Sequence, residues 1–272
     1  MINRLIGSIG LLVLLFLFSV PFSRCTRSKT IITDTVALNN DTDVNLSKGL
    51  LVYYAFNNSL ADSSGNGHNG TGGGNLRFTS DRNNNANGAV SFDGSSSYIM
   101  LKDSGSLSPG SLTVAVQFYT DTAVHESLFG KCDFSTANSI VWGATIFGED
   151  PYPNSVSFGV QGPSVACGQY DPFSHSDLVY SIVQIQPKKW YQVTLVFDGG
   201  VEKIYLNGVL RNAITKSFTT AKQCTDASMI LGAFWRSNPY FFHGKMDEFR
   251  FYNRALNEEE IAQLSLGFDA VN

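Results

Sequence analysis

Aromatic and polar side chains gather in two connecting segments of the sequence, and this mixture is what proteins use to bind sugars. The apolar faces of sugar rings stack on aromatic rings, while neighbouring polar side chains fix the hydroxyls. The segment 234–240, F-W-R-S-N-P-Y, has this mixture, and so does the segment 168–175. The sequence therefore predicts a carbohydrate-binding surface, for which we single out Trp235, Arg236, Tyr240, Tyr170 and Trp142.

The same rings have a structural alternative, because aromatic side chains also fill cores and cover sheet edges. The Trp235 indole could cover an edge with its N–H bonded to a carbonyl, or stack on a sugar while Arg236 donates to hydroxyls or a carboxylate. The turn itself needs only the residues at 237–239, Ser-Asn-Pro. The Trp and Arg before it therefore favour binding, and the core alternative stays open.

Carboxylates and histidines form no catalytic pattern in the sequence. Glu149 and Asp150 are adjacent, so on a strand they would face opposite sides. The acidic run 258–260 is explained by the start of a helix, where the helix dipole favours negative charge. The four histidines are scattered, and no G-x-S-x-G motif is present. We expect no catalytic residues, although distant strands could still bring two carboxylates together.

Charge and cysteine content narrow the possible partners and cofactors. The formal net charge is −4 with no basic stripe, so nucleic acid is not expected as a partner. No cysteine has a C-x-x-C neighbour, which argues against a zinc site. Cys132, Cys167 and Cys224 remain after Cys25, an odd count that allows one internal bridge at most. We expect Cys167 and Cys224, both flanked by turn residues, to form it.

The first 25 residues are expected to be a targeting signal. Arg4 supplies positive charge, residues 5–20 are almost wholly apolar, and Pro21 ends the run. Cys25 follows directly, where bacterial lipoproteins are cleaved and acylated, so we predict lipidation at Cys25. An ordinary cleaved signal and an uncleaved anchor are the alternatives. Residues 26–48 are polar and predict a flexible linker. We expect an exported protein, either a cell-envelope lipoprotein or a secreted one.

The rest of the chain, residues 49–272, predicts one all-β domain. About a dozen short strand-like runs are bounded by turn residues, and Asn207-Gly208 between two apolar runs marks a hairpin. The segment 241–252 alternates as a half-buried strand, and Asn257 with Glu260 forms a capping box for one short helix. Because no helices are available to connect parallel strands, we predict an antiparallel β-sandwich with one short C-terminal helix.

Four stretches give the chain a resemblance to a known family. They span residues 53–71, 89–99, 189–208 and 244–261, the last being G-K-M-D-E-F-R-F-Y-N-R-A-L-N-E-E-E-I. In their order and spacing they resemble the laminin-G-like branch of the concanavalin A-like lectin/glucanase superfamily, over residues 49–267. The resemblance implies a jelly-roll sandwich. It leaves function open, because the fold hosts lectins, adhesion domains and hydrolases. The E-x-D-x-E run of the superfamily's glucanases is absent.

The resemblance also implies a structural calcium ion. In similar proteins the aspartate of the D-x-S-G-x-G-x-x-G loop and an aspartate in the last strand clasp Ca²⁺. If the same ligands are used in this sequence, Asp62 and Asp247 supply carboxylates, and Asn66 and His68 supply backbone oxygens. The chemistry is suitable, because Ca²⁺ takes six to eight oxygen ligands and a glycine-rich loop can turn its carbonyls inward.

These observations predict a non-catalytic, extracytoplasmic binding module with a glycan or polysaccharide as its ligand. A protein partner in adhesion or complex assembly is the alternative, and a glycoside hydrolase or polysaccharide lyase of the same fold is the second alternative. The only membrane association expected is through the N-terminal lipid.

Overall fold

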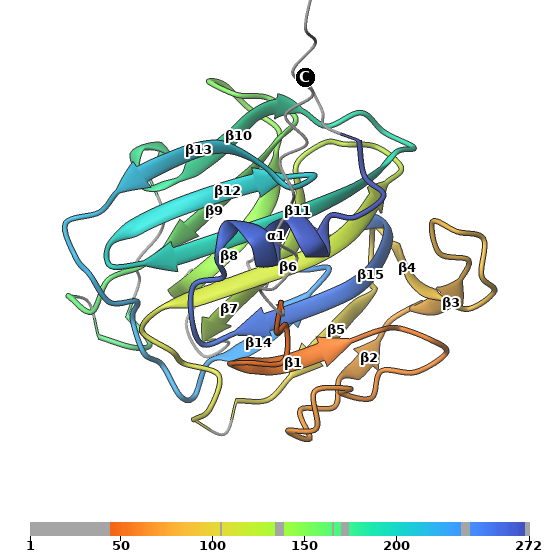
Figure 1. Ribbon diagram of the computed structural model, residues 1–272, viewed down its shortest axis with the longest axis horizontal. Coiled ribbons are helices and arrows are strands. Elements are labelled where there is room, and N and C mark those ends of the chain that lie inside the picture. The colour runs from red at the N-terminus through yellow and green to blue at the C-terminus, as the bar shows by residue number, and fades with distance from the viewer. Residues whose placement is uncertain are drawn as a thin grey trace, which may run out of the picture. The chain divides into compact units, whose positions relative to one another are not determined.

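The computed structural model describes residues 44–103, 105–133, 139–164, 166–169, 174–234 and 240–269, and the structural statements below concern these residues. They form two antiparallel sheets packed face to face, which confirms the predicted sandwich (Figure 1). The first sheet has eight strands: β1 (Leu50–Tyr54), β3 (Arg77–Thr79), β4 (Ala89–Asp93), β6 (Leu112–Thr120), β11 (Trp190–Asp198), β12 (Val201–Leu206), β13 (Val209–Thr215) and β15 (His243–Tyr252).

The second sheet has seven strands in the order β10-β9-β8-β7-β14-β5-β2. Their bounds are β2 (Thr71–Gly73), β5 (Tyr98–Leu101), β7 (Glu126–Asp133), β8 (Ser139–Phe147), β9 (Ser155–Val160), β10 (Val179–Gln184) and β14 (Ser228–Leu231). A 3-10 turn, η1 (His175–Asp177), precedes β10, and the α-helix α1 (Glu258–Leu264) follows β15.

Strand β15 lies at the centre of the first sheet and shows the alternation that its sequence predicts. Phe249 and Phe251 point into the core between the sheets, while Tyr252 points to the outer face. β15 pairs with β6 along one side, and on the other side with β4 through residues 243–246 and with β1 through residues 249–252. Glu248, with a φ of 53°, forms a bulge between these two halves.

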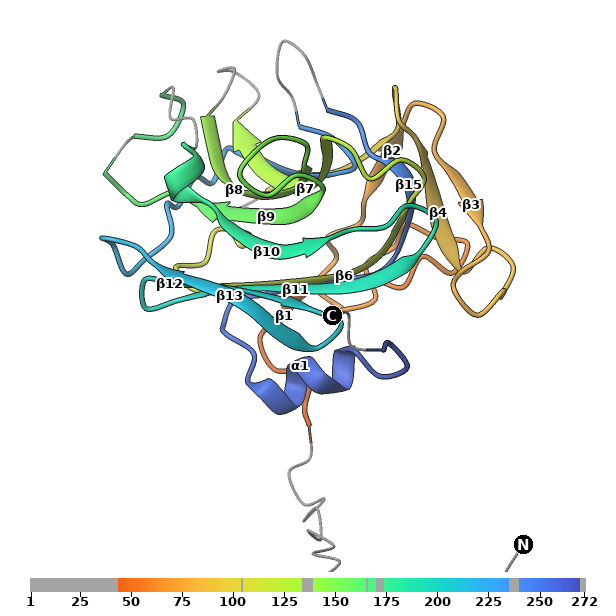
Figure 2. The same ribbon diagram turned by 90° about the horizontal axis from the view of Figure 1, so that it is seen from above.

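Helix α1 covers the outer face of the first sheet, on the side away from the second sheet (Figure 2). The predicted capping box is present: the Asn257 side chain accepts from the Glu260 N–H, and the Glu260 side chain accepts from the Asn257 N–H. Ile261 and Leu264 pack on Tyr252 and the neighbouring side chains of the sheet. The short helix is therefore stabilised by its capping box and by the burial of its apolar side against the sheet.

The N-terminal predictions lie mostly outside the described residues, Cys25 and the apolar run 5–20 included. Residues 44–48, which we assigned to the linker, are part of the domain. Leu46 packs against the apolar cluster that contains Ile261 and Leu264 of α1. The Lys48 carbonyl accepts from Arg254 Nε at 2.8 Å. Within the described parts of the chain, no helix is long and apolar enough to cross a membrane.

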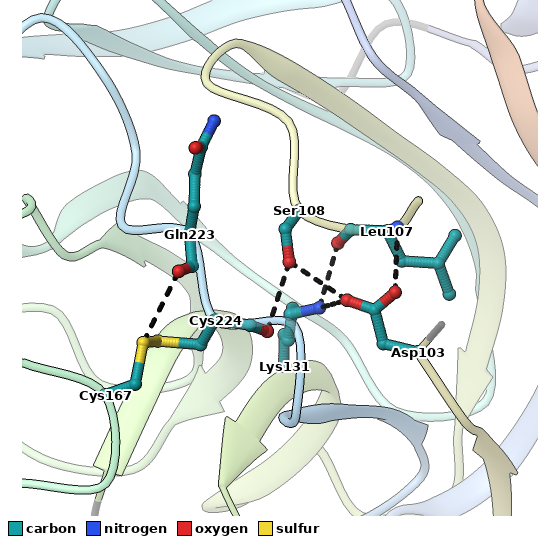
Figure 3. The surroundings of a disulfide bond; sticks show 7 residues. All are labelled: Asp103, Leu107, Ser108, Lys131, Cys167, Gln223 and Cys224. Atoms are coloured by element: carbon teal, nitrogen blue, oxygen red, sulfur yellow. Dashed lines mark hydrogen bonds and ion pairs between the residues drawn. A yellow bond between two sulfur atoms is a disulfide. The ribbon is translucent and has the colours of Figure 1, made fainter. Parts of the chain in front are cut away.

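Cys167 and Cys224 are joined by a disulfide, the pair that the sequence favoured, and a buried ion pair lies beside it (Figure 3). Lys131 of β7 bonds the Asp103 carboxylate and donates to the Leu107 carbonyl at 3.0 Å, and neither charged side chain is exposed. Ser108 connects the two features, because its hydroxyl bonds both Asp103 and the Cys224 carbonyl. This end of the sandwich is thus held by a covalent bond and a satisfied internal charge pair.

Candidate functional site

A pocket of about 240 Å³ opens on the outer face of the second sheet. In β8, Ala144 and Ile146 point into the core, so the alternate residues Gly143, Thr145 and Phe147 face outward and line the pocket. The complete lining is His125, Ile140, Gly143, Thr145, Phe147, Glu149, Ser157, Leu178, Phe234 and Tyr240. Rings, hydroxyls and one carboxylate therefore meet in one cavity.

The Phe234 ring packs against two glycines of the second sheet, Gly130 and Gly143. Gly130 of β7 and Gly143 of β8 are direct cross-strand partners. A Cβ atom on Gly130 would stand 1.8 Å from the Phe234 ring, and one on Gly143 would stand 2.4 Å from it. Because neither glycine has a Cβ, the ring lies directly on the backbone of the sheet. Phe234 is 4% exposed, so this contact anchors the start of the connection from β14 to β15.

The end of the same connection is anchored by a ring stack. Tyr240 lies parallel to the His125 imidazole, with 3.9 Å between ring centroids and 6° between planes. The Tyr240 carbonyl accepts from the Ser127 N–H at 3.2 Å. Glu149 stands at the rim, with its Oε1 4.0 Å from His125 Nδ1. Both ends of the connection therefore line the pocket, with residues 235–239 between them.

The predicted ligand residues have different outcomes. Tyr240 lines the pocket. The prediction for Trp142 is wrong: it is 1% exposed and packs between the sheets, with its ring centroid 5.2 Å from that of Phe251. Its indole fills the core, which was the structural alternative for these rings. Trp235, Arg236 and Tyr170 lie outside the described residues.

Sequence reasoning missed most of the pocket. The segment 234–240 was singled out, and its two ends, Phe234 and Tyr240, do line the pocket. His125 and Phe147 come from two other segments, and no local pattern connects them to it. One signal was available, since Gly130 and Gly143 are single glycines inside strand patterns, which indicates a bulge or a close approach of another group.

Asp62, a predicted calcium ligand, organises its own loop. Its Oδ1 accepts the N–H groups of Tyr53 and Ser64, and its Oδ2 accepts the His68 N–H and the Ser64 hydroxyl. Burial alone would raise the pKa of Asp62, but these donors lower it below its usual value. The Asn66 amide donates to the Leu50 and Leu51 carbonyls, and the His68 carbonyl accepts from the Tyr54 hydroxyl at 2.5 Å. The loop thus closes through hydrogen bonds within the protein.

Asp247, the other predicted carboxylate, lies in different surroundings. It is 6% exposed, and its Oδ1 accepts the N–H of Glu248 at 2.8 Å. Burial, followed by the charges of Glu248 and Asp81, raises its pKa to about 7, with Arg250 acting in the opposite direction. No three His, Cys, Asp or Glu side chains of the described residues stand close enough together to hold a metal ion.

Two further carboxyl groups are buried inside the sandwich. Glu126 accepts from the Thr120 hydroxyl at 2.8 Å and from the Thr122 hydroxyl. Glu202 accepts the Val160 N–H at 2.7 Å and pairs with Lys216 at 3.3 Å. Burial is the main reason that the pKa of each rises to about 7. Neither lines the pocket, so they do not complete a catalytic pair with Glu149.

Comparison with known proteins agrees with this architecture. A family model described as concanavalin A-like lectin/glucanases superfamily matches residues 93–262. No curated protein matches the sequence. Among solved structures, domain 4 of AbnA, a GH43 extracellular arabinanase from Geobacillus stearothermophilus, was determined with arabinotriose. It matches with a TM-score of 0.59 and 23% identity, over 79% of this chain and 98% of that chain.

Toxin domains form a second group of similar structures. The binding domain of botulinum neurotoxin serotype D/C matches with a TM-score of 0.58 and 12% identity, over 81% of this chain and 52% of that chain. The binding domain of Paraclostridial Mosquitocidal Protein 1 matches with a TM-score of 0.60 and 14% identity, over the same shares of the two chains. This chain therefore corresponds to about half of each toxin domain, and at these identities the likeness concerns the fold.

Proposed function

Since this chain belongs to the concanavalin A-like lectin/glucanases superfamily, we propose that it is a non-catalytic binding module whose pocket on the outer face of the second sheet takes a carbohydrate. The observation that carries the proposal is the stacked pair of Tyr240 and His125 beside the hydroxyls of Thr145 and Ser157. Rings suit the apolar face of a sugar, and hydroxyls exchange hydrogen bonds with its polar edge.

Trp235 and Arg236 belong to the same proposal. The chain enters the connection at Phe234 and leaves it at Tyr240, both in the pocket lining. Trp235 and Arg236 directly follow Phe234 in the sequence. We propose that both side chains contact the ligand. Tyr170 stays a prediction of the same kind.

Among the described residues that line the pocket, a second carboxylate is absent, and this supports the proposal that the module is non-catalytic. Glycoside hydrolases of the common type use two carboxyl groups about 5–10 Å apart, one on each side of the scissile bond. Glu149 is the sole carboxylate among the described residues that line the pocket. A binding role needs no such pair.

The ligands printed for similar structures support a carbohydrate as the class of ligand. Arabinotriose is the ligand printed for the arabinanase domain, and one botulinum toxin domain is described in complex with SialylT. A toxin domain of the same group is described with rat synaptotagmin II. A protein partner is therefore the second candidate function for this chain.

Glycan binding is tested directly with an array of glycans probed with the protein and with two variants. Tyr240→Ala removes the stacked ring of the pocket. Tyr119→Ala removes a half-buried ring on the first sheet and serves as control. We expect the wild type and the control to retain the same glycans, and Tyr240→Ala to lose at least about ten-fold in affinity. Equal retention by all three proteins would contradict the assignment of this pocket.

A structural calcium ion at Asp247 is a separate proposal. A cation beside this buried carboxylate would offset the negative charges of Asp81 and Glu248. A ligand that binds only the folded state raises the melting temperature by mass action. We expect excess Ca²⁺, compared with chelator, to raise the melting temperature of the wild type and of an Asp198→Asn control, but not that of Asp247→Asn. An equal shift in all three would remove Asp247 from the site.

Export and lipidation at Cys25 are proposals that the apolar run 5–20 supports. Expression in a bacterium followed by fractionation tests them. We expect a membrane-associated, lipid-modified product from the wild type and loss of the modification in Cys25→Ser. A soluble wild-type product that begins after Cys25 would contradict lipidation.

A further inference from the structure

A row of aromatic rings leads from the pocket across the outer face of the second sheet. It starts at Tyr240 and His125, continues to Phe147 with 5.6 Å between ring centroids, and then to Tyr180 with 5.4 Å. Tyr152 ends the row, 5.2 Å from Tyr180. Each ring touches the next, so the apolar surface continues beyond the pocket, whose lining contains neither Tyr180 nor Tyr152.

A row of hydroxyl groups crosses the same face. By strand register Ser127 is opposite Thr145, Thr145 is opposite Ser157, and Ser157 is opposite Tyr180. Directly opposed residues point to the same side of a sheet, so these four side chains share the outer face. At the centre of the row, Thr145 Oγ1 and Ser157 Oγ lie 2.8 Å apart and form one hydrogen bond. Polar groups therefore accompany the rings from one end of the row to the other.

The Tyr180 hydroxyl, at the far end of this row, has no hydrogen-bond partner among the described residues. Tyr180 is 4% exposed, and burial is the main reason that its pKa is raised. Buried polar groups are nearly always bonded, so an unpartnered one calls for an explanation. Tyr152 is 38% exposed and touches Tyr180, so it forms the solvent side of this contact. The unpartnered hydroxyl therefore lies on a residue that contacts an exposed ring.

We propose that Tyr152 and Tyr180 form a second sugar-binding position next to the pocket, so that the site takes a glycan of at least two units lying across β7 to β10. This inference rests on the proposed function. The pocket holds one unit against Tyr240 and His125. The next unit stacks on Tyr152 and exchanges a hydrogen bond with the Tyr180 hydroxyl, a group that can both donate and accept. Phe147, between the two positions, supplies an apolar contact to both.

The experiment compares short and long ligands in matched variants of the full chain. The probes are neutral mono-, di- and trisaccharides of arabinose, xylose, glucose, galactose and mannose, and calorimetry gives the dissociation constants. Tyr180→Phe removes only the hydroxyl, and Tyr152→Ala removes the exposed ring. Tyr252→Phe is the control, because Tyr252 is also buried with an unpartnered hydroxyl but lies under α1 on the other sheet. Thermal melting checks that each variant is folded.

We expect the wild type to bind a trisaccharide more tightly than the matching monosaccharide. Tyr180→Phe should reduce this affinity ratio about five-fold and Tyr152→Ala about ten-fold, as the loss of one hydrogen bond and one ring contact implies. Tyr252→Phe should leave the ratio unchanged. If saccharides bind but Tyr180→Phe leaves the ratio at its wild-type value, the second position is wrong while the proposed function stands. If the wild type binds no member of the panel and no glycan of the array, the proposed function fails, and the second position fails with it.

Discussion

The outer faces of the two sheets have similar residue types but different surroundings. Each has a buried tyrosine whose hydroxyl lacks a partner among the described residues, Tyr252 on the first sheet and Tyr180 on the second. Helix α1 covers Tyr252, while Tyr180 is in contact with the exposed ring of Tyr152. The comparison shows that a tyrosine in an outward strand position does not by itself mark a binding face. What covers the strand decides its role.

Polar groups on the two faces differ in the same way. Over the first sheet the Ser265 hydroxyl donates to Gln192 at 2.8 Å, and Arg254 pairs with Glu260 at 2.6 Å. These bonds fasten the helix and its flanking turns to the sheet, since Gln192 lies in β11. On the second sheet the pocket presents Thr145, Ser157 and Glu149 to a cavity. The polar groups of the first face therefore hold the helix to the sheet, whereas those of the second face line a cavity.

The largest expected effect comes from the charge pair that supports the second sheet. Asp103→Ala leaves the Lys131 ammonium buried without its partner, and breaking such a pair costs about 3–5 kcal/mol of unfolding free energy. Glu248→Gln, at a partly exposed ion pair with Arg250 on the first sheet, should cost about 1 kcal/mol or less. Urea denaturation measures both. Similar costs for the two variants would contradict the difference in burial.

Removing the cover of the first face tests whether it is purely structural. Ile261→Ala shortens a 1% exposed side chain of α1 and should cost about 2–5 kcal/mol. Because Ile261 is on the opposite side of the sandwich from the pocket, glycan affinity of the folded variant should remain at the wild-type value. A loss of affinity at a temperature where melting shows the variant to be folded would mean that the two faces are coupled.

The Phe234 contact gives a test of how the second face is built. Gly143→Ala puts a Cβ atom against the Phe234 ring and should cost about 1–3 kcal/mol by overpacking. It should also weaken glycan binding, because Phe234 lines the pocket. Adding Phe234→Ala to Gly143→Ala removes the clash, so the two substitutions together should cost less than the sum of their separate effects. Simple additivity in a denaturation experiment would contradict the contact.

The smallest expected effect concerns pH and the buried carboxyl of Asp247. Its pKa is about 7 in the folded protein and near 4 when unfolded, so the folded state holds the proton more tightly. This contribution to stability is present below pH 4 and is lost as the pH rises to about 7. Without calcium, Asp247→Asn should be more stable than the wild type by about 1–2 kcal/mol at pH 8 and similar to it near pH 4. An equal difference at both pH values would contradict the shifted pKa.

Local sequence determined much of the fold, because its signals act over a few residues. Alternation in 241–252 gave β15 its inward Phe249 and Phe251, and Asn257 with Glu260 formed the predicted capping box. Asn207-Gly208 adopts positive φ values at the predicted hairpin between β12 and β13. The Gly-rich loop after β1 was recognised too, although its Asp62 serves hydrogen bonds within the loop. Each of these features needs only neighbouring residues and the period of a strand or helix.

Tertiary structure decided which faces are covered and which side chains meet. Trp142 and Tyr240 looked alike in the sequence, yet Trp142 fills the core and Tyr240 stacks on His125 at the pocket. Lys131, a charged residue within a strand, is buried because a distant loop brings Asp103 to it. Alternation tells which residues share a side of a strand, but packing of sheet on sheet and helix on sheet determines which side water reaches.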